Sequence, residues 1–208
     1  MNDTIKTLKT GTTTVCIVTK DGVVVAAEQK ATMGFQVESK NAQKVHKLDD
    51  SMGLTIAGSV GDAQAVIRLM RAQIKLYKLD RVTMNVKAAA NLLSNILQGS
   101  KFYPYYNLFL LVGYDSTGSH IFSIDPVGGY SSEDNFYSTG SGSPYAYGVL
   151  EAEYKEGISL NDGIGLAVKA IKSAIERDIG SGGRGITVAV VTKDGFKELT
   201  SAEVKKYY

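Results

Sequence analysis

The sequence predicts an α+β fold, a four-layer αββα sandwich in which two antiparallel sheets stack face to face and a helix pair flanks each outer side. Strand patterns joined by Asp-Gly turns occur near both ends of the chain, and segments with helical periodicity lie between them. The order is strands, two helices, strands, two helices, strands. Helix pairs separated from hairpins in this way are expected to cover sheets from the outside.

The strands are predicted from apolar runs bounded by turn residues. The first hairpin pairs residues 13–20 with residues 23–29 through Asp21-Gly22. A related pattern, strand, Thr-Lys-Asp-Gly, strand, recurs over residues 188–199. Further strands are predicted near residues 108–114 and 120–124. We expect these hairpin-connected strands to form the two sheets.

Four segments have the apolar spacing of amphipathic helices. In the first pair, over residues 63–77 and 86–97, the core-facing positions are Ala63, Val66, Ile67, Met70, Ile74 and Tyr77, then Ala89, Leu92, Leu93 and Ile96. In the second pair, Ser143 is predicted as an N-cap before Pro144, opening a helix to about residue 154. Ser159 is predicted to cap the last helix, which runs to about residue 178.

The composition fits one domain and excludes several classes of protein. The chain has 208 residues, 44% hydrophobic content and a spread-out formal charge of +2, so no nucleic-acid partner is indicated. Its longest apolar runs, residues 23–27 and 108–112, are far shorter than the ~20 residues of a membrane span. The polar residues 1–11 lack the apolar region of a secretion signal. A cytoplasmic protein without a membrane association is therefore the expectation.

Few residues are available for metal or cofactor chemistry. The single cysteine, Cys16, lies in a predicted strand as a buried hydrophobe, and the only histidines are His46 and His120. This scarcity argues against a multi-histidine metal site and a Ser-His-Asp triad. Residues 180–185 match G-x-G-x-x-G, but a helix precedes them and a strand follows, the reverse of a dinucleotide-binding unit. We expect an enzyme with no metal and no cofactor.

The bond between Gly11 and Thr12 precedes the first predicted strand. Cutting it would give Thr12 a free α-amine, with a pKa of about 7.7–8.0, on the same residue as a hydroxyl nucleophile. The alternative is that this glycine and the threonines after it are only a turn leading into a strand.

Six blocks spread along the chain together resemble an archaeal-type proteasome core-particle β subunit. They are residues 9–15 (KTGTTTV), 26–34 (AAEQKATMG), 39–44 (SKNAQK), 55–64 (TIAGSVGDAQ), 138–144 (STGSGSP), and 177–178 with 181–183 (RD and SGG). The resemblance implies a zymogen whose propeptide, residues 1–11, is removed autocatalytically. Residues 12–208 would then form a single N-terminal-nucleophile hydrolase domain.

The implied activity is that of a threonine endopeptidase, which hydrolyses peptide bonds without ATP inside a barrel-shaped protein-degradation chamber. The implied partners are proteasome α subunits and other β subunits in a seven-membered ring. Unfolded polypeptides would be the substrates, delivered by an ATPase regulator. The helices around residues 63–77 and 143–154 would contact the neighbouring subunits.

The resemblance also implies the catalytic residues. Thr12 is the nucleophile, Lys44 lies beside its hydroxyl and moves its proton, and Glu28 pairs with the lysine. The backbone amide of Gly58 forms the oxyanion hole. The remaining residues, which hydrogen-bond around the threonine amine and hold a water, are Ser141, Asp178 and Ser181.

A peptide substrate is expected to add a strand between the segments around Thr32 and residues 58–60. The family positions that line the specificity pocket are Ala31, Ala42, His46, Ile56, Val60 and Gln64. Because this set is mostly apolar, we expect broad cleavage with a preference for hydrophobic residues. His46 could point into the pocket or be a structural histidine.

Two other functions are compatible with parts of the sequence. A structural β subunit would fill the ring without catalysis, although Thr12, Lys44 and Gly58 are all present. A small-molecule amidase of the N-terminal-nucleophile class would share the fold and the threonine chemistry. It would not predict the Gly-Ser-Gly-Ser-Pro and Ser-Gly-Gly loops or assembly into rings.

Overall fold

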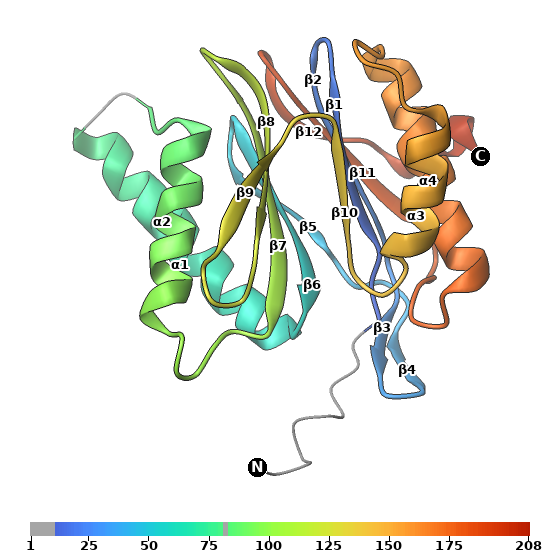
Figure 1. The fold of residues 1–208 in the computed structure, drawn as a ribbon, viewed down its shortest axis with the longest axis horizontal. Helices are drawn as coiled ribbons and strands as arrows, with labels where there is room; N and C mark the ends of the chain where they lie inside the picture. Colours follow the sequence, from blue (N-terminus) through green and yellow to red (C-terminus); the bar gives the residue numbers. More distant parts are fainter. Residues whose placement is uncertain (1–10, 81–82) are drawn as a thin grey trace.

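The computed structural model describes residues 11–80 and 83–208. Within these residues, two five-stranded antiparallel sheets lie face to face, and helices cover the outer side of each (Figure 1). The predicted α+β class and four-layer αββα sandwich are therefore confirmed.

The first sheet has the strand order β10-β1-β2-β11-β12. Its strands are β1 (Thr14–Thr19), β2 (Gly22–Glu28), β10 (Phe136–Thr139), β11 (Ile186–Thr192) and β12 (Gly195–Glu198). Both predicted hairpins are present in this sheet. Thr19 pairs with Gly22 and Thr192 with Gly195, so each glycine is the first residue of its strand and the tight turn precedes it.

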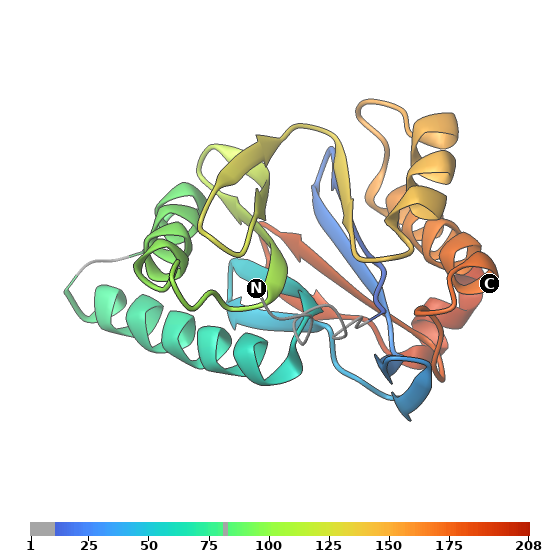
Figure 2. The ribbon, with the colours of Figure 1, turned by 60° about the horizontal axis from the view of Figure 1, so that its bottom comes forward.

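The second sheet has the order β5-β6-β7-β8-β9. Its strands are β5 (Val45–Asp49), β6 (Met52–Gly58), β7 (Asn107–Asp115), β8 (Gly118–Ile124) and β9 (Tyr130–Glu133). A separate hairpin, β3 (Ala31–Met33) and β4 (Gln36–Ser39), projects beyond one end of the sandwich (Figures 1 and 2). The strands predicted near residues 108–114 and 120–124 are β7 and β8.

The helix pairs lie where the apolar spacing predicts them. Helices α1 (Val60–Asp80) and α2 (Val86–Gly99) cover the second sheet, and α3 (Ser143–Glu153) and α4 (Leu160–Arg177) cover the first (Figure 1). The short α5 (Ser201–Val204) and the 3₁₀ helix η2 (Lys205–Tyr207) follow β12. The described helices are too short or too polar to cross a membrane.

One helix start differs from the prediction. The N-cap of α3 is Gly142, which has no side-chain cap, and Ser143 is already helical. A Cβ atom on Gly142 would lie 2.0 Å from the Oγ1 atom of Thr13, so this close approach leaves no room for a capping side chain there. The predicted cap of α4 is confirmed, because the Ser159 side chain accepts from the amide of Asp162.

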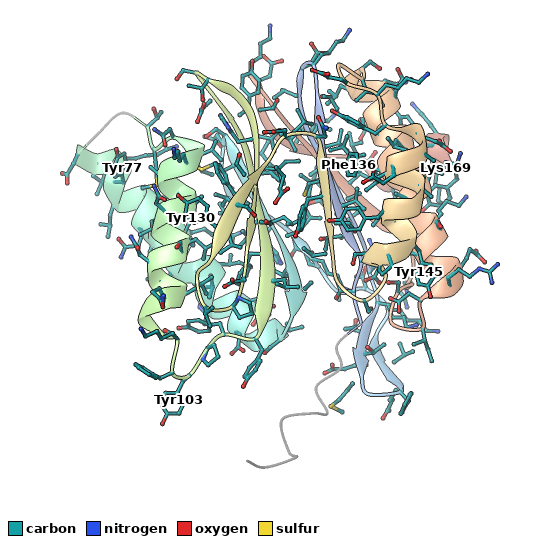
Figure 3. The ribbon with its side chains drawn as sticks, viewed as in Figure 1. Tyr77, Tyr103, Tyr130, Phe136, Tyr145 and Lys169 are labelled. Carbon is teal, nitrogen blue, oxygen red and sulfur yellow. The ribbon has the colours of Figure 1, made fainter. Side chains whose placement is uncertain are left out.

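Three apolar layers hold the sandwich together. One lies between the sheets and includes Cys16, Val25, Leu110 and Val112, and the other two lie between each sheet and its helices. The buried position predicted for Cys16 is confirmed, and burial raises the pKa of its thiol well above the usual range. Phe136, at the start of β10 and labelled in Figure 3, packs its ring edge-on against Tyr154, the residue that follows α3.

Candidate active site

The candidate site lies at the end of the sandwich where β1 begins. Thr12 lies two residues before the start of β1, Glu28 ends β2, and Lys44 immediately precedes β5. These three side chains are buried, with relative exposures of 3%, 0% and 5%. Pairing of β1 with β2 brings the start of one strand beside the end of the other, which places Thr12 near Glu28.

Lys44 joins the threonine to the carboxylate. Its Nζ atom donates to the Oγ1 atom of Thr12 at 3.0 Å and to the carbonyl oxygen of Gly11 at 3.3 Å, and it forms an ion pair with Glu28. The ammonium group therefore contacts both the hydroxyl of Thr12 and the peptide bond that precedes it.

Glu28 is held by backbone donors as well as by the lysine. One carboxylate oxygen accepts from the amide of Thr13 at 3.2 Å, and the other from the amides of Lys30 at 2.6 Å and Gly182 at 3.0 Å. A buried carboxylate is costly unless its oxygens are satisfied. These amides fix the orientation of Glu28 and, through it, that of Lys44.

Burial shifts the pKa values of the two charged partners toward each other. It lowers the pKa of Lys44 and raises the pKa of Glu28, while their mutual attraction opposes both shifts. A lysine with a lowered pKa releases its proton more readily than one in water. Lys44 is thus placed and tuned to exchange a proton with the Thr12 hydroxyl.

The second group of polar side chains comes from two glycine-rich loops. The Oγ atom of Ser141 accepts from the amide of Thr12 at 3.2 Å and donates to the carboxylate of Asp178 at 2.7 Å. The same carboxylate accepts from Ser181 at 2.7 Å. The Ser181 hydroxyl in turn lies 2.6 Å from that of Thr13, so Ser141 alone of the two serines has a hydrogen bond with Thr12.

Gly11, the residue before Thr12, has hydrogen bonds at both its carbonyl oxygen and its amide. The hydroxyl of Thr12 donates to the carbonyl oxygen of Gly11 at 2.7 Å, and the amide of Gly11 donates to the Oγ1 atom of Thr32 at 2.9 Å. The predicted propeptide, residues 1–11, otherwise lies outside the described residues.

A cavity of about 580 Å³ opens beside Thr12. All the positions expected to bind substrate line it, namely Ala31, Thr32, Ala42, His46, Ile56, Val60 and Gln64. His46 thus borders the cavity, and burial lowers the pKa of its imidazole. Its Nε2 atom is buried and has no hydrogen-bond partner among the described residues.

Gly58 lines the same cavity as Thr12, at the end of β6. Its φ angle is +145°, and a Cβ atom there would lie 2.0 Å from the carbonyl oxygen of Tyr106. Backbone conformation and the close neighbour both require glycine. This places a backbone segment without a side chain at the wall of the cavity.

Comparisons with known proteins cover most of the chain. A family model described as Proteasome subunit matches residues 8–191. The chain belongs to the proteasome subunit family. The resemblance inferred from the six sequence blocks is therefore confirmed.

Several archaeal relatives of this proteasome subunit are similar over nearly their whole length. "Proteasome subunit beta" of Methanocaldococcus vulcanius is 50% identical over 199 residues, covering 94% of this chain and 88% of the relative. "Proteasome subunit beta" of Methanospirillum hungatei JF-1 is 48% identical over 204 residues, covering 98% and 95%. "Proteasome subunit beta 2" of Pyrococcus furiosus is 49% identical over 197 residues, covering 94% of each.

Two contributors to this proteasome subunit's site were missed by the sequence reasoning. The Nζ atom of Lys30 donates to the carbonyl oxygens of Ile179 at 2.6 Å and Ser181 at 3.2 Å, which ties the loop after α4 to the end of β2. Gly180 of that loop lies against Gly11. Lys30 belongs to one of the six blocks, whereas the position of Gly180 could be found only from the tertiary structure.

The described part of this proteasome subunit contains no group of three or more His, Cys, Asp or Glu side chains that could hold a metal ion. The arrangement instead combines a hydroxyl, a buried lysine-carboxylate pair and a cavity. A hydroxyl beside a basic amine can act as a nucleophile toward a carbonyl group.

Proposed function

We propose that this chain is a catalytic β subunit of the proteasome core particle, a threonine endopeptidase with Thr12 as its nucleophile. The observation that carries the proposal is the contact of 3.0 Å between the Nζ atom of Lys44 and the Oγ1 atom of Thr12, in a buried pair with Glu28. A hydroxyl needs an adjacent base to become a nucleophile, and Lys44 is the basic side chain in contact with it.

The first reaction is removal of residues 1–11 by the chain itself. The Oγ1 atom of Thr12 attacks the carbonyl carbon of Gly11, the C–N bond breaks, and the hydroxyl proton passes to the leaving nitrogen. Water then hydrolyses the resulting ester, which frees a carboxylate on Gly11 and the α-amine of Thr12. Residues 12–208 form the mature hydrolase domain, so the uncut chain is a zymogen.

The same hydroxyl then attacks peptide substrates. Lys44 accepts its proton, and the protonated α-amine of Thr12 gives a proton to the leaving amine. In a second step water hydrolyses the ester, while the α-amine takes a proton from the water and Lys44 returns its proton to the Thr12 hydroxyl. The amide of Gly58 stabilises the oxyanion, a contribution typically worth about 3–4 kcal/mol. Ser141, Asp178 and Ser181 orient the α-amine and a water. None of these steps consumes ATP.

Substrate is bound as an extended strand between the segments around Thr32 and Gly58, where backbone hydrogen bonds give broad sequence tolerance. The cavity beside Thr12 accepts the side chain that precedes the cut bond. Ala31, Ile56 and Val60 in its wall support a preference for hydrophobic residues.

The enzyme acts in the cytoplasm within a barrel of seven-membered β rings and α rings, with its sites facing an enclosed chamber. An apolar stripe on α1 supports such contacts, because Leu69, Leu76 and Leu79 are 39%, 56% and 76% exposed. On α3, Tyr145 is 42% exposed and points outward (Figure 3). Unfolded polypeptides enter this chamber, delivered by an ATPase regulator.

The test is the intact mass of the chain after co-assembly with its α partner. Loss of residues 1–11 with appearance of peptide hydrolysis supports the proposal. Retention of those residues in a fully assembled particle favours a structural β subunit. Hydrolysis of small amides by a chain that forms no ring favours an amidase.

A further inference from the structure

Three glycines pack against three consecutive residues around the bond that is to be cut. A Cβ atom on Gly140 would lie 2.1 Å from the carbonyl oxygen of Thr12, and one on Gly142 would lie 2.0 Å from the Oγ1 atom of Thr13. A Cβ atom on Gly180 would lie 2.4 Å from the Cα atom of Gly11. Real Cβ atoms essentially never come this close to a neighbour, so all three positions depend on glycine.

The contact between Gly180 and Gly11 is reciprocal and involves backbone alone. A Cβ atom on Gly11 would lie 2.1 Å from the Cα atom of Gly180 and 2.6 Å from its carbonyl carbon. Since no side chain can turn away at either residue, the two backbones must separate if either glycine is replaced.

This contact also differs from the other two in its lifetime. Gly140 and Gly142 touch Thr12 and Thr13, which remain after cleavage. Gly11 leaves with the propeptide, so its contact with Gly180 exists only in the uncut chain.

Gly180 is itself firmly placed. Its amide donates to the carboxylate of Asp178 at 3.2 Å, and the carbonyl of the preceding Ile179 accepts from Lys30 at 2.6 Å. Gly11 is held elsewhere by Thr32 and Lys44. The anchored loop thus adds a steric contact that restricts the movement of Gly11. The Thr12 hydroxyl lies 2.7 Å from the carbonyl oxygen of this restricted residue.

We propose that Gly180 is a positioning residue for self-cleavage of the Gly11-Thr12 bond, through a backbone contact with Gly11 that the later turnover of peptides does not use. The proposal rests on the proposed function, because it assumes that Thr12 cuts its own preceding bond. It predicts that the two activities of one nucleophile respond differently to the same substitution.

The experiment compares Gly180→Ala in two forms of the chain, each co-assembled with α subunits. One form is full length, and the other is produced without residues 1–11 so that Thr12 is the first residue. Gly180 is not among the glycines with positive φ, so alanine fits the backbone there. In the trimmed form, the new methyl group would lie 2.9 Å from the Oγ atom of Ser141 and 3.3 Å from a carboxylate oxygen of Asp178, so turnover by this form measures how much of the effect passes through those two side chains.

Self-cleavage is followed by intact mass and turnover by hydrolysis of a fluorogenic peptide. We expect Gly180→Ala to slow self-cleavage at least tenfold more than it slows turnover by the trimmed form, and Gly11→Ala, which leaves the mature site unchanged, to slow self-cleavage at least tenfold. The matched control is Gly99→Ala at the end of α2, where a Cβ atom meets nothing within 4 Å and both rates should stay at wild-type values.

Unchanged self-cleavage in Gly180→Ala, or an equal loss of self-cleavage and turnover, overturns the proposal. If Gly180→Ala does not assemble, Gly11→Ala tests the same contact, because residue 11 is absent from the mature enzyme. Wild-type self-cleavage in Gly11→Ala also overturns it. A trimmed wild-type chain that assembles but hydrolyses no peptide overturns the proposed function, and this inference with it.

Discussion

The Nζ atom of Lys44 lies 3.0 Å from the Oγ1 atom of Thr12, although the two residues are 32 positions apart in the sequence. The lysine reaches the threonine from the start of β5, in the sheet opposite the one that contains β1. The stacking of the two sheets therefore creates the contact between hydroxyl and amine. The following predictions test what this contact does.

Replacing Thr12 by alanine removes the hydroxyl that we assign as the nucleophile. Peptide hydrolysis should fall by roughly 10⁶-fold, to below detection, as when other hydrolases lose their nucleophile. Residues 1–11 should also remain attached, which intact mass will reveal. Thr12→Ser keeps a hydroxyl and should retain both activities, whereas processing in Thr12→Ala would rule out the assignment.

Lys44→Ala removes the proposed proton acceptor and leaves the fold in place. The carboxylate of Glu28 keeps its three backbone donors, so the variant should assemble normally. We expect kcat to fall by about 10²–10⁴-fold, the usual contribution of a general base. Steady-state kinetics on the assembled particle measure this, and a normal kcat would exclude proton transfer by Lys44.

Glu28→Ala should cost more stability than Lys44→Ala, because it leaves a buried ammonium without its ion-pair partner. Breaking one side of a buried pair typically costs about 3–5 kcal/mol. Thermal unfolding of the isolated subunit should show a clear drop in Tm. Glu153→Ala, which breaks an exposed pair with Lys169, is the control and should leave Tm nearly unchanged.

The pH dependence of hydrolysis should reflect the lowered pKa of Lys44. Activity requires its neutral form, so kcat/KM rises as pH increases through the pKa of this lysine. Glu28→Gln removes the negative charge that favours the protonated amine. The pKa of Lys44 should then fall further. The part of the pH profile in which kcat/KM rises should therefore move to lower pH in the variant. An unchanged position of this part, or a move to higher pH, contradicts this assignment.

His46→Leu should make the cavity beside Thr12 wholly apolar on that side. Specificity is the ratio of kcat/KM for peptides with leucine or phenylalanine before the cut bond to kcat/KM for peptides with glutamine there. This ratio should be about tenfold higher in the variant than in the wild type. The variant should also unfold at a higher temperature, since a buried nitrogen without a partner is removed. His120→Gln, outside the cavity, is the control, and equal specificity in both variants would show that His46 does not shape the pocket.

The local sequence predicted the elements that have strong local signals. Asp-Gly turns marked the hairpins of β1 with β2 and of β11 with β12, and apolar spacing marked the four long helices. The strands β3, β4, β5, β9 and β10 were not identified, because each is only three to five residues long, and β4 and β9 are in addition largely exposed. The cap of α3 was assigned one residue late, since the reason for Gly142 is Thr13, a residue far away in the sequence.

The sequence by itself determined the fold class, the family and the residue types of the candidate site. These follow from periodicity, turn chemistry and motif blocks, all of which are properties of neighbouring residues. The resemblance also predicted that Lys44 pairs with Glu28 beside Thr12. Only the tertiary structure decided that Ser141 and Ser181 contact different threonines and that Gly180 lies against Gly11. Such contacts depend on how sheets and loops stack in space. A local sequence pattern contains no information about the distance between residues that are far apart along the chain.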